Sequence, residues 1–499
     1  MQGVRGSSPL RSTKQNSPPR RGVLRFRRHT TRRRCAPRRS GRTLWRCPNV
    51  SSWPRSTGRS PHGERASRNP CRSNTKNHSF AWPGLRFLFK PCDCSVIKHI
   101  RRDSMIESRP LKRTRGRVAA IASATAMVGS LFIATAPAYA GPPANAHCGT
   151  EASNNIDGFV NHAQLTKALH KIEHTTNGTV AVDVLGQTGN GTDIYTARVG
   201  HGDTVIFIES QIHGNENHGT EALLNLLADW GSNTPAAQKL RDAVTIVTIP
   251  RMNVDGGEND TRQNQHSWDE VVADFPQLEG AQPSWNYNSR VGGFDMNRDF
   301  NPDLDYVPDP ADFPGTSAGT GWYINPETQL VRDLYRDLED EFGTVDYFVD
   351  LHNQGSCYVD SATGERSFLS ISGRFIADPT AFGDWPKFDY DHSRRANVAV
   401  YNALQSRGES GFGNATLYPQ DTNLPGTALG SFALRGSATV LFETSSQTQY
   451  DGTKSSGKLI KQVETGLTGL VDAVVDGSID NLDPEDYEEI PTREPFPRD

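Results

Sequence analysis

Short apolar runs rich in β-branched residues recur along the chain from residue 179 onward, and polar turns bound them. Such runs predict strands that are buried on both faces of a sheet. They lie at 179–185, 193–199, 204–209, 244–249, 349–351 and 440–442. The first two are close enough in sequence to predict a paired hairpin, and the remaining four predict further strands of one sheet.

Leucines at helical spacing fill the intervals between several of these runs. Residues 220–230 predict one helix. Residues 325–343 predict another, with Asn325 as the N-cap, Pro326 in the first turn and a glycine at the end. Because strands and helices take turns, we expect an α/β fold with a mixed, mostly parallel twisted sheet flanked by helices. The stretch 256–321 is rich in Asn, Asp, Pro and Gly and predicts long loops that carry part of a functional site.

The first 104 residues differ in composition from the rest of the chain. They hold 26 basic residues against three acidic ones, and they contain five of the seven cysteines without a regular metal-binding spacing. One interpretation is a basic arm for nucleic acid. The interpretation that we favour is a disordered segment or sequence mistranslated upstream of the true start, for which the next 36 residues give the reason.

Residues 105–140 have the pattern of a secretory signal peptide. Five basic residues follow Met105, then comes the apolar run 118–136, and then the small-residue ending Ala138-Tyr139-Ala140. The apolar run is long enough to span a bilayer, but its ending favours cleavage. We therefore expect a protein that is secreted into the extracellular medium and begins near Gly141.

Residues 141–499 carry 23 basic and 53 acidic residues, a formal charge of about −30. This charge argues against nucleic acid as a partner and against stable membrane association after signal cleavage. We expect residues 141–479 to form one catalytic domain and residues 480–499 to form a solvated acidic tail. Cys148 and Cys357 are the two cysteines of this part, and they either form a disulfide or stay as two thiols.

Candidate residues for a metal site follow three of the predicted strands. His213 and Glu216 come just after the third apolar run, His352 comes directly after the fifth, and Glu443 directly after the sixth. A His and a Glu three residues apart, joined by a distant second His, can give zinc three protein ligands and leave a fourth position for water. Glu443 is then left over as a possible general base.

A second His-x-x-Glu pair competes with the first. His218 and Glu221 repeat the spacing five residues later, but they lie inside the predicted helix 220–230 or at its start. Because strand ends converge at the edge of a sheet, we favour His213 and Glu216 as ligands and expect the second pair to flank the helix.

The loop-rich stretch contains a second candidate cluster, Asp295-Met296-Asn297-Arg298. An Arg fork beside an Asn amide can bind a carboxylate through parallel hydrogen bonds. The alternative is a turn with a surface ion pair.

Taken in chain order, His213 and Glu216, the turn 250–256, the cluster at 295–298, His352 and Glu443 resemble the zinc metallocarboxypeptidases of the carboxypeptidase A type. The resemblance covers roughly residues 161–470. It implies a carboxypeptidase A-like fold and one zinc ion per chain, held by His213, Glu216 and His352. It also implies that Glu443 takes a proton from the attacking water and passes it to the leaving amine.

The same resemblance implies how a peptide substrate with a free C-terminus is bound. Asn297 and Arg298 would hold the terminal carboxylate, and Arg290 would polarise the scissile carbonyl. Tyr418 is similar to the family's mobile lid tyrosine. No acid lies at 429–432, where the specificity pocket is expected, so a preference for C-terminal Lys or Arg is not indicated.

Two departures and two alternatives remain. Asn353 follows His352 where the digestive enzymes have Ser, so we expect a remodelled cleft rim, and no propeptide of useful length separates Ala140 from the first strand.

A zinc amidase of the same fold, acting on cell-wall peptides or N-acyl amino acids, would share the metal and the base. A non-catalytic zinc or peptide-binding module would not need Glu443.

Overall fold

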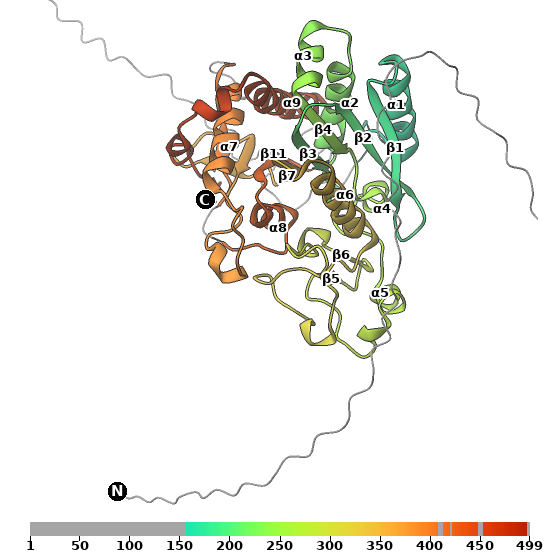
Figure 1. Ribbon diagram of the computed structural model, residues 1–499. Helices are drawn as coiled ribbons and strands as arrows, with labels where there is room; N and C mark the ends of the chain where they lie inside the picture. Colours follow the sequence, from blue (N-terminus) through green and yellow to red (C-terminus); the bar gives the residue numbers. More distant parts are fainter. Residues whose placement is uncertain (1–155, 157, 408–412, 420–421, 448–452, 497–499) are drawn as a thin grey trace, which may run out of the picture. The chain divides into compact units, whose positions relative to one another are not determined.

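The computed structural model describes residues 156, 158–407, 413–419, 422–447 and 453–496 (Figure 1). The expected basic segment, the signal peptide and Cys148 lie outside the described residues. Among the helices of the described part, none combines the length and the apolarity that crossing a membrane requires.

An eight-stranded sheet forms the centre of the fold, in the order β1-β2-β4-β3-β7-β11-β9-β10. Strands β4, β3, β7 and β11 run parallel, whereas β1 and β2 form an antiparallel hairpin at one edge and β9 runs antiparallel to β11. This confirms the predicted mixed, mostly parallel sheet. The strands are β1 (Val180–Gln187), β2 (Asp193–Gly200), β3 (Thr204–Ser210), β4 (Val244–Ile249), β7 (Tyr347–Gln354), β9 (Leu369–Ser372), β10 (Ala415–Leu417) and β11 (Ala438–Ser445).

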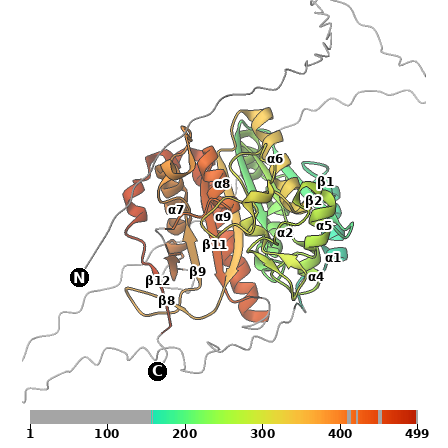
Figure 2. The same cartoon turned by 90° about the horizontal axis from the view of Figure 1, so that it is seen from below.

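Helices cover both faces of the sheet (Figure 2), which explains why its central strands are apolar at successive positions. In β3, Ile206 and Ile208 pack into one core with α1, α2, α3, α7 and α9. Val205 and Phe207 point the other way, into a core with α6 and α8. The helices are α1 (His162–Thr175), α2 (His218–Trp230), α3 (Pro235–Ala243), α6 (Pro326–Phe342), α7 (Tyr390–Gln405), α8 (Ala428–Arg435) and α9 (Thr453–Asp476).

The long connection between β4 and α6 has a small core of its own. Trp268, Val271, Phe294 and Trp322 are buried together, so this loop-rich stretch is a folded cap. It contains α4 (Val254–Glu258), α5 (Trp268–Asp274), a short hairpin of β5 (Tyr287–Asn288) and β6 (Gly293–Phe294), and the 3-10 turns η1 (Pro276–Leu278), η2 (Met296–Arg298) and η3 (Pro310–Asp312).

Residues 480–496, whose acidic composition predicts a solvated tail, instead fold onto the domain. Tyr487 is fully buried, and Ile490 packs into the same core, which also holds α7 and α9. These apolar side chains, spaced among acids, anchor the segment. The turn η5 (Ser478–Asn481) leads into this segment, which contains η6 (Pro484–Tyr487) and β12 (Arg493–Pro495). Strand β12 pairs antiparallel with β8 (Tyr358–Asp360). A further 3-10 turn, η4 (Pro379–Phe382), follows β9.

Candidate active site

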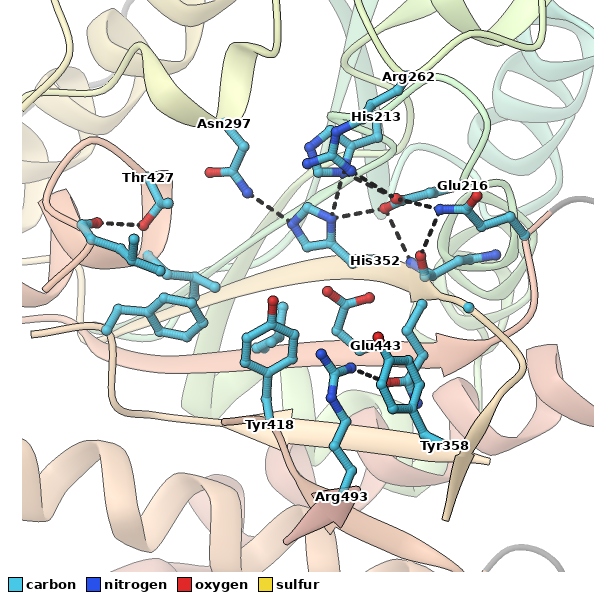
Figure 3. A pocket seen from close by; sticks show the side chains of 18 of the residues that line it. His213, Glu216, Arg262, Asn297, His352, Tyr358, Tyr418, Thr427, Glu443 and Arg493 are labelled. Carbon is cyan, nitrogen blue, oxygen red and sulfur yellow. Dashed lines mark hydrogen bonds and ion pairs between the residues drawn. The ribbon is translucent and has the colours of Figure 1, made fainter. Parts of the chain in front are cut away.

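Three parallel strands bring the candidate residues to one edge of the sheet (Figure 3). His213 and Glu216 lie on the loop that follows β3, His352 lies in β7, and Glu443 lies in β11. Glu443 is the register partner of His352, so the two side chains stand next to each other on neighbouring strands. Because parallel strands end at the same edge, residues far apart in sequence meet there.

The loop between β3 and α2 holds its shape through a close backbone approach. At Gly214, a Cβ atom would lie only 2.1 Å from the carbonyl carbon of Gly256 in α4. Any larger residue would push His213 and Glu216 away from the sheet edge, so glycine at this position fixes the pair.

His213, Glu216 and His352 direct one donor atom each toward a common point, and all three are buried. The Nδ1 atom of His213 lies 3.1 Å from Glu216 Oε1 and 3.0 Å from His352 Nδ1, and His352 Nδ1 lies 2.8 Å from Glu216 Oε2. Tetrahedral zinc with bonds of about 2.0–2.1 Å separates its ligand atoms by about 3.3 Å. Two imidazoles and a carboxylate at these separations fit zinc, and they form the zinc-ligand triad of the chain.

Two further carboxylates orient the imidazoles of the triad. Asp295 Oδ1 lies 3.1 Å from His213 Nε2, and Asp350 Oδ2 lies 2.7 Å from His352 Nε2. Each Nε2–H therefore donates to a carboxylate, which leaves the Nδ1 lone pair for the metal. Burial opposes the charge of Asp295, but His213 and then Arg262 outweigh it and hold the pKa of Asp295 well below its usual range.

The carboxylates around His352 favour the protonated form of its imidazole. Burial lowers the pKa of His352, but Asp350 and then Glu216 outweigh this effect and raise that pKa well above its usual range. Metal binding must displace this proton, so the affinity of the triad for zinc falls at low pH.

The competing pair at the start of α2 takes no part in the triad. His218 is fully buried, with Nδ1 3.0 Å from Thr444 Oγ1 and its ring edge-on to Phe159. The sequence preference for His213 and Glu216 over His218 and Glu221 is confirmed, because the buried metal-type group contains only the first pair.

Glu443 and the triad line the same cavity, which has a volume of about 190 Å³. Burial raises the pKa of Glu443 to about 7, because the positive charge of His352 does not compensate for the lost solvent. The cavity is lined by His213, Glu216, Arg262, Asn297, Arg298, His352, Asn353, Gln354, Gly355, Tyr358, Phe375, Tyr418, Leu424, Thr427, Leu429, Leu441, Glu443, Gln447 and Arg493.

The structure brings Asn297, Arg298 and Tyr418 to this same cavity. Asn297 is buried, its Nδ2 donates to Asp350 Oδ2 at 3.5 Å, and its Oδ1 accepts a hydrogen bond from the backbone N–H of Ala428 at 3.1 Å. The Asn amide is thus fixed between the metal site and the start of α8. Arg298 follows it in η2, and Tyr418 follows β10.

Arg290 is not part of this arrangement. It is exposed in the turn of the β5–β6 hairpin and does not line the cavity. Arg262 occupies the position beside the metal ligands instead, with Nη2 2.9 Å from Asp295 Oδ2 and Nη1 3.5 Å from Glu216 Oε1. Spacing in the sequence could not identify Arg262, because the small core of the cap separates it from Asn297.

Arg493 of β12 is a second cavity residue that the sequence interpretation missed. Its neighbours in the chain are acidic, and the whole segment was expected to be solvated. Only the apolar positions at 479, 487 and 490 signal that this segment packs against the domain.

Three comparisons with known proteins were made. The family model described as zinc carboxypeptidase matches residues 165–419, just over half of the chain. No curated protein matches the chain in sequence.

Similar solved structures include bovine thrombin-activatable fibrinolysis inhibitor, at 13% identity over 64% of this chain and 98% of that one, with a TM-score of 0.43. A metallo-carboxypeptidase from Burkholderia cenocepacia is 15% identical over 63% and 70% of the two chains, with a TM-score of 0.40. Carboxypeptidase A from Helicoverpa armigera is 14% identical over 64% and 75%, with a TM-score of 0.41.

Proposed function

The chain belongs to the zinc carboxypeptidase family and is a peptide hydrolase, and from this premise we propose that it removes single residues from the free C-terminus of peptides with Glu443 as the general base. The observation that carries the proposal is the position of Glu443. It stands beside His352 in register, while the triad has three ligands without it. A carboxylate that the metal does not need is available for proton transfer.

Zinc at the triad would supply a Lewis acid that lowers the pKa of water and polarises a carbonyl. Glu443 accepts a proton from the attacking water and later donates it to the leaving amine. Glu443 lines the same cavity as the triad, which is where both proton transfers would take place.

Arg262 is our candidate for the group that stabilises the negative charge on the carbonyl oxygen. Its guanidinium is already held by Asp295, with Nε and Nη2 at 3.1 Å and 2.9 Å from Asp295 Oδ2. A donor that is fixed before the reaction requires no reorganisation when charge develops. We propose that this role belongs to Arg262 in place of Arg290.

Asn297 and Arg298, which both line the cavity, are our candidates for holding the terminal carboxylate of the peptide. An Arg–Asn pair supplies charge-assisted hydrogen bonds that a chain end satisfies and a peptide interior does not. Next to them, Phe375, Leu424 and Leu429 line the cavity. This lining supports an apolar C-terminal side chain in the substrate. Tyr418 lines the same cavity.

The first prediction tests this function with two matched peptides, one with a free C-terminal carboxylate and one amidated. Glu443→Gln should retain zinc and bind the free-acid peptide, whereas its turnover should fall by roughly 10²–10⁴-fold because Gln cannot act as a base. The native enzyme should cleave the amidated peptide poorly. Zinc is measured by elemental analysis and turnover by release of the free amino acid.

Glu221→Gln is the control, because Glu221 belongs to the competing His-x-x-Glu pair and does not line the cavity. It should leave turnover unchanged. Equal cleavage of both peptides by the native enzyme would indicate an amidase or endopeptidase, and loss of zinc from Glu443→Gln would make Glu443 a metal ligand.

A further inference from the structure

The segment after η6 is built into the wall of the cavity. Strand β12 pairs with β8 on one side, and Phe496 N–H donates to Cys357 O at 2.8 Å. On the other side, Leu417 N–H donates to Pro491 O at 2.8 Å. Backbone hydrogen bonds to two different elements therefore fix the position from which Arg493 reaches into the cavity.

The guanidinium of Arg493 lies between two tyrosine rings. Its Cζ atom is 4.1 Å from the ring centroid of Tyr358 and 4.0 Å from that of Tyr418. One of its Nη atoms donates to Gln354 Oε1. Stacking on both faces holds the plane of the fork but uses none of its N–H groups.

Arg493 has donors to spare and no ion-pair partner among the described residues, although its charge acts on Glu443 and offsets part of the rise in pKa that burial causes in that carboxyl. Its Nε is buried and has no hydrogen-bond partner within the part of the chain that the structure describes. No described carboxylate forms an ion pair with it, whereas Arg262 is paired with Asp295. A guanidinium that is fixed between two rings and still has free N–H groups can bind an anion such as a carboxylate.

The position of Arg493 relative to Glu443 indicates which part of a peptide would meet it. In Figure 3, Asn297 and Thr427 lie above and to the left of Glu443, and Arg493 lies below it, between Tyr418 and Tyr358. If the terminal residue lies on the Asn297 side, the scissile bond lies at Glu443. The residue before the scissile bond then passes Arg493.

We propose that Arg493 is a specificity-determining residue that binds the carboxylate of an Asp or Glu side chain at the penultimate position of the peptide. This inference rests on the proposed carboxypeptidase function, because the orientation of the peptide depends on it. A planar guanidinium matches a carboxylate through two parallel hydrogen bonds, which an amide of the same shape cannot equal.

The second prediction compares peptides that share an apolar C-terminal residue and differ only in Glu, Gln or Lys before it. The native enzyme should cleave the Glu peptide with a kcat/KM about tenfold above that of the Gln peptide, as expected for one charge-assisted interaction. Lys should be the poorest. Added salt should reduce the preference, because the site is partly exposed.

Arg493→Gln should bring the Glu-to-Gln ratio to about one and still cleave the Gln peptide, and Arg493→Lys should retain part of the preference because it keeps the charge. Zinc content and thermal unfolding show that both variants are folded. Arg332→Gln is the control, since Arg332 also stacks on a tyrosine, Tyr323, but lies outside the cavity. It should keep the native ratio.

The inference is overturned if the native enzyme cleaves the Glu and Gln peptides equally. It is also overturned if Arg493→Gln slows both peptides alike, because Arg493 would then only hold Tyr358 and Tyr418 in place. Failure of the proposed function gives a different result, namely that the native enzyme releases no C-terminal residue from any of the three peptides.

Discussion

Arg262 contacts several groups of the metal site at once. It is bound to Asp295, which in turn orients His213, and it lies near Glu216. Burial lowers the pKa of Arg262, but Asp295 and then Glu216 outweigh it, so that the pKa is raised above its usual value and the group stays charged. A permanent, fixed positive charge beside the metal ligands is suited to stabilising an oxyanion.

The third prediction separates Arg262 from Arg290. Arg262→Lys keeps the charge but loses the fork, and kcat should fall by roughly 10²–10³-fold while zinc is retained, as expected for loss of an oxyanion donor. Arg290→Ala should leave kcat within a factor of about two, because surface changes have small effects. Steady-state kinetics and elemental analysis measure both. The opposite ranking would return the role to Arg290.

At the scale of elements, the sequence correctly predicts where α6 begins, but the hydrogen bonds at its start differ from those that the sequence suggests. The sequence predicts Asn325 as the N-cap, and the helix does begin after it, but the Asn325 side chain makes no capping bond. Instead, buried Asp299 accepts hydrogen bonds from Asn325 N–H at 3.0 Å, Asn325 Nδ2 at 2.8 Å and Thr328 Oγ1 at 2.6 Å. These hydrogen bonds to Asp299 at the start of α6 also fix η2, which directly precedes Asp299 and contains Asn297 and Arg298.

The same element contains a buried acid. Glu327, in the first turn of α6, is only 1% exposed and accepts a hydrogen bond from Asn264 Nδ2 at 3.2 Å. Burial raises the pKa of Glu327 to about 7 from about 4.5. Because the folded state holds the proton more tightly, the contribution of Glu327 to stability is fully present below pH ~4.5 and is lost as pH rises through ~7.

The fourth prediction follows from the loss of this stability contribution as pH rises. Glu327→Gln should match the native protein near pH 4.5 and exceed it at pH 8 in free energy of unfolding, by roughly 3 kcal/mol for a shift of this size. Glu341→Gln on the same helix is the control. The Arg198 partner lowers the pKa of Glu341, so the native protein should be more stable than this variant above pH ~4.5, and the difference should shrink as pH falls below that value. Denaturant unfolding at several pH values measures both, and a pH-independent difference for Glu327→Gln would contradict the assignment.

The sequence predicts a strand where a continuous apolar run of several residues marks it. The six apolar runs correspond to β1, β2, β3, β4, β7 and β11, and the zinc ligands were found because they follow these strands. Strands of two to four residues, such as β8 and β12, carry too few positions for a period to be visible. Arg262 and Arg493 escaped for a further reason: tertiary contacts of the cap and of β12 bring them to the cavity, and no sequence spacing encodes these contacts.

At the scale of the whole molecule, charge is divided sharply along the chain. Residues 1–104 hold 26 of the 54 basic residues, whereas residues 141–499 hold 53 of the 57 acidic ones. The apolar run 118–136 lies between these two parts. This division supports our proposal that only the acidic part, with its arginine-lined cavity, is the mature and secreted enzyme.

The fifth prediction is that protein recovered from the culture medium begins near Gly141. N-terminal sequencing measures this directly, and a change of Ala138 and Ala140 to larger residues should block the cleavage, because the signal peptidase site requires small residues. The matched control is a change of Tyr139 between them, which should leave the cleavage unaffected. Retention of residues 1–104 in the mature protein, or of all the protein inside cells, would contradict the proposal.

The triad joins His213 and His352, which are 139 positions apart in the chain. Parallel strands pair only after long connections have closed, which makes this kind of topology slow to fold. No fragment of the β3 or β7 region alone contains the three ligands, so a nascent or partly folded chain has no complete site for the metal. The three ligands therefore come together only once β3 and β7 have paired.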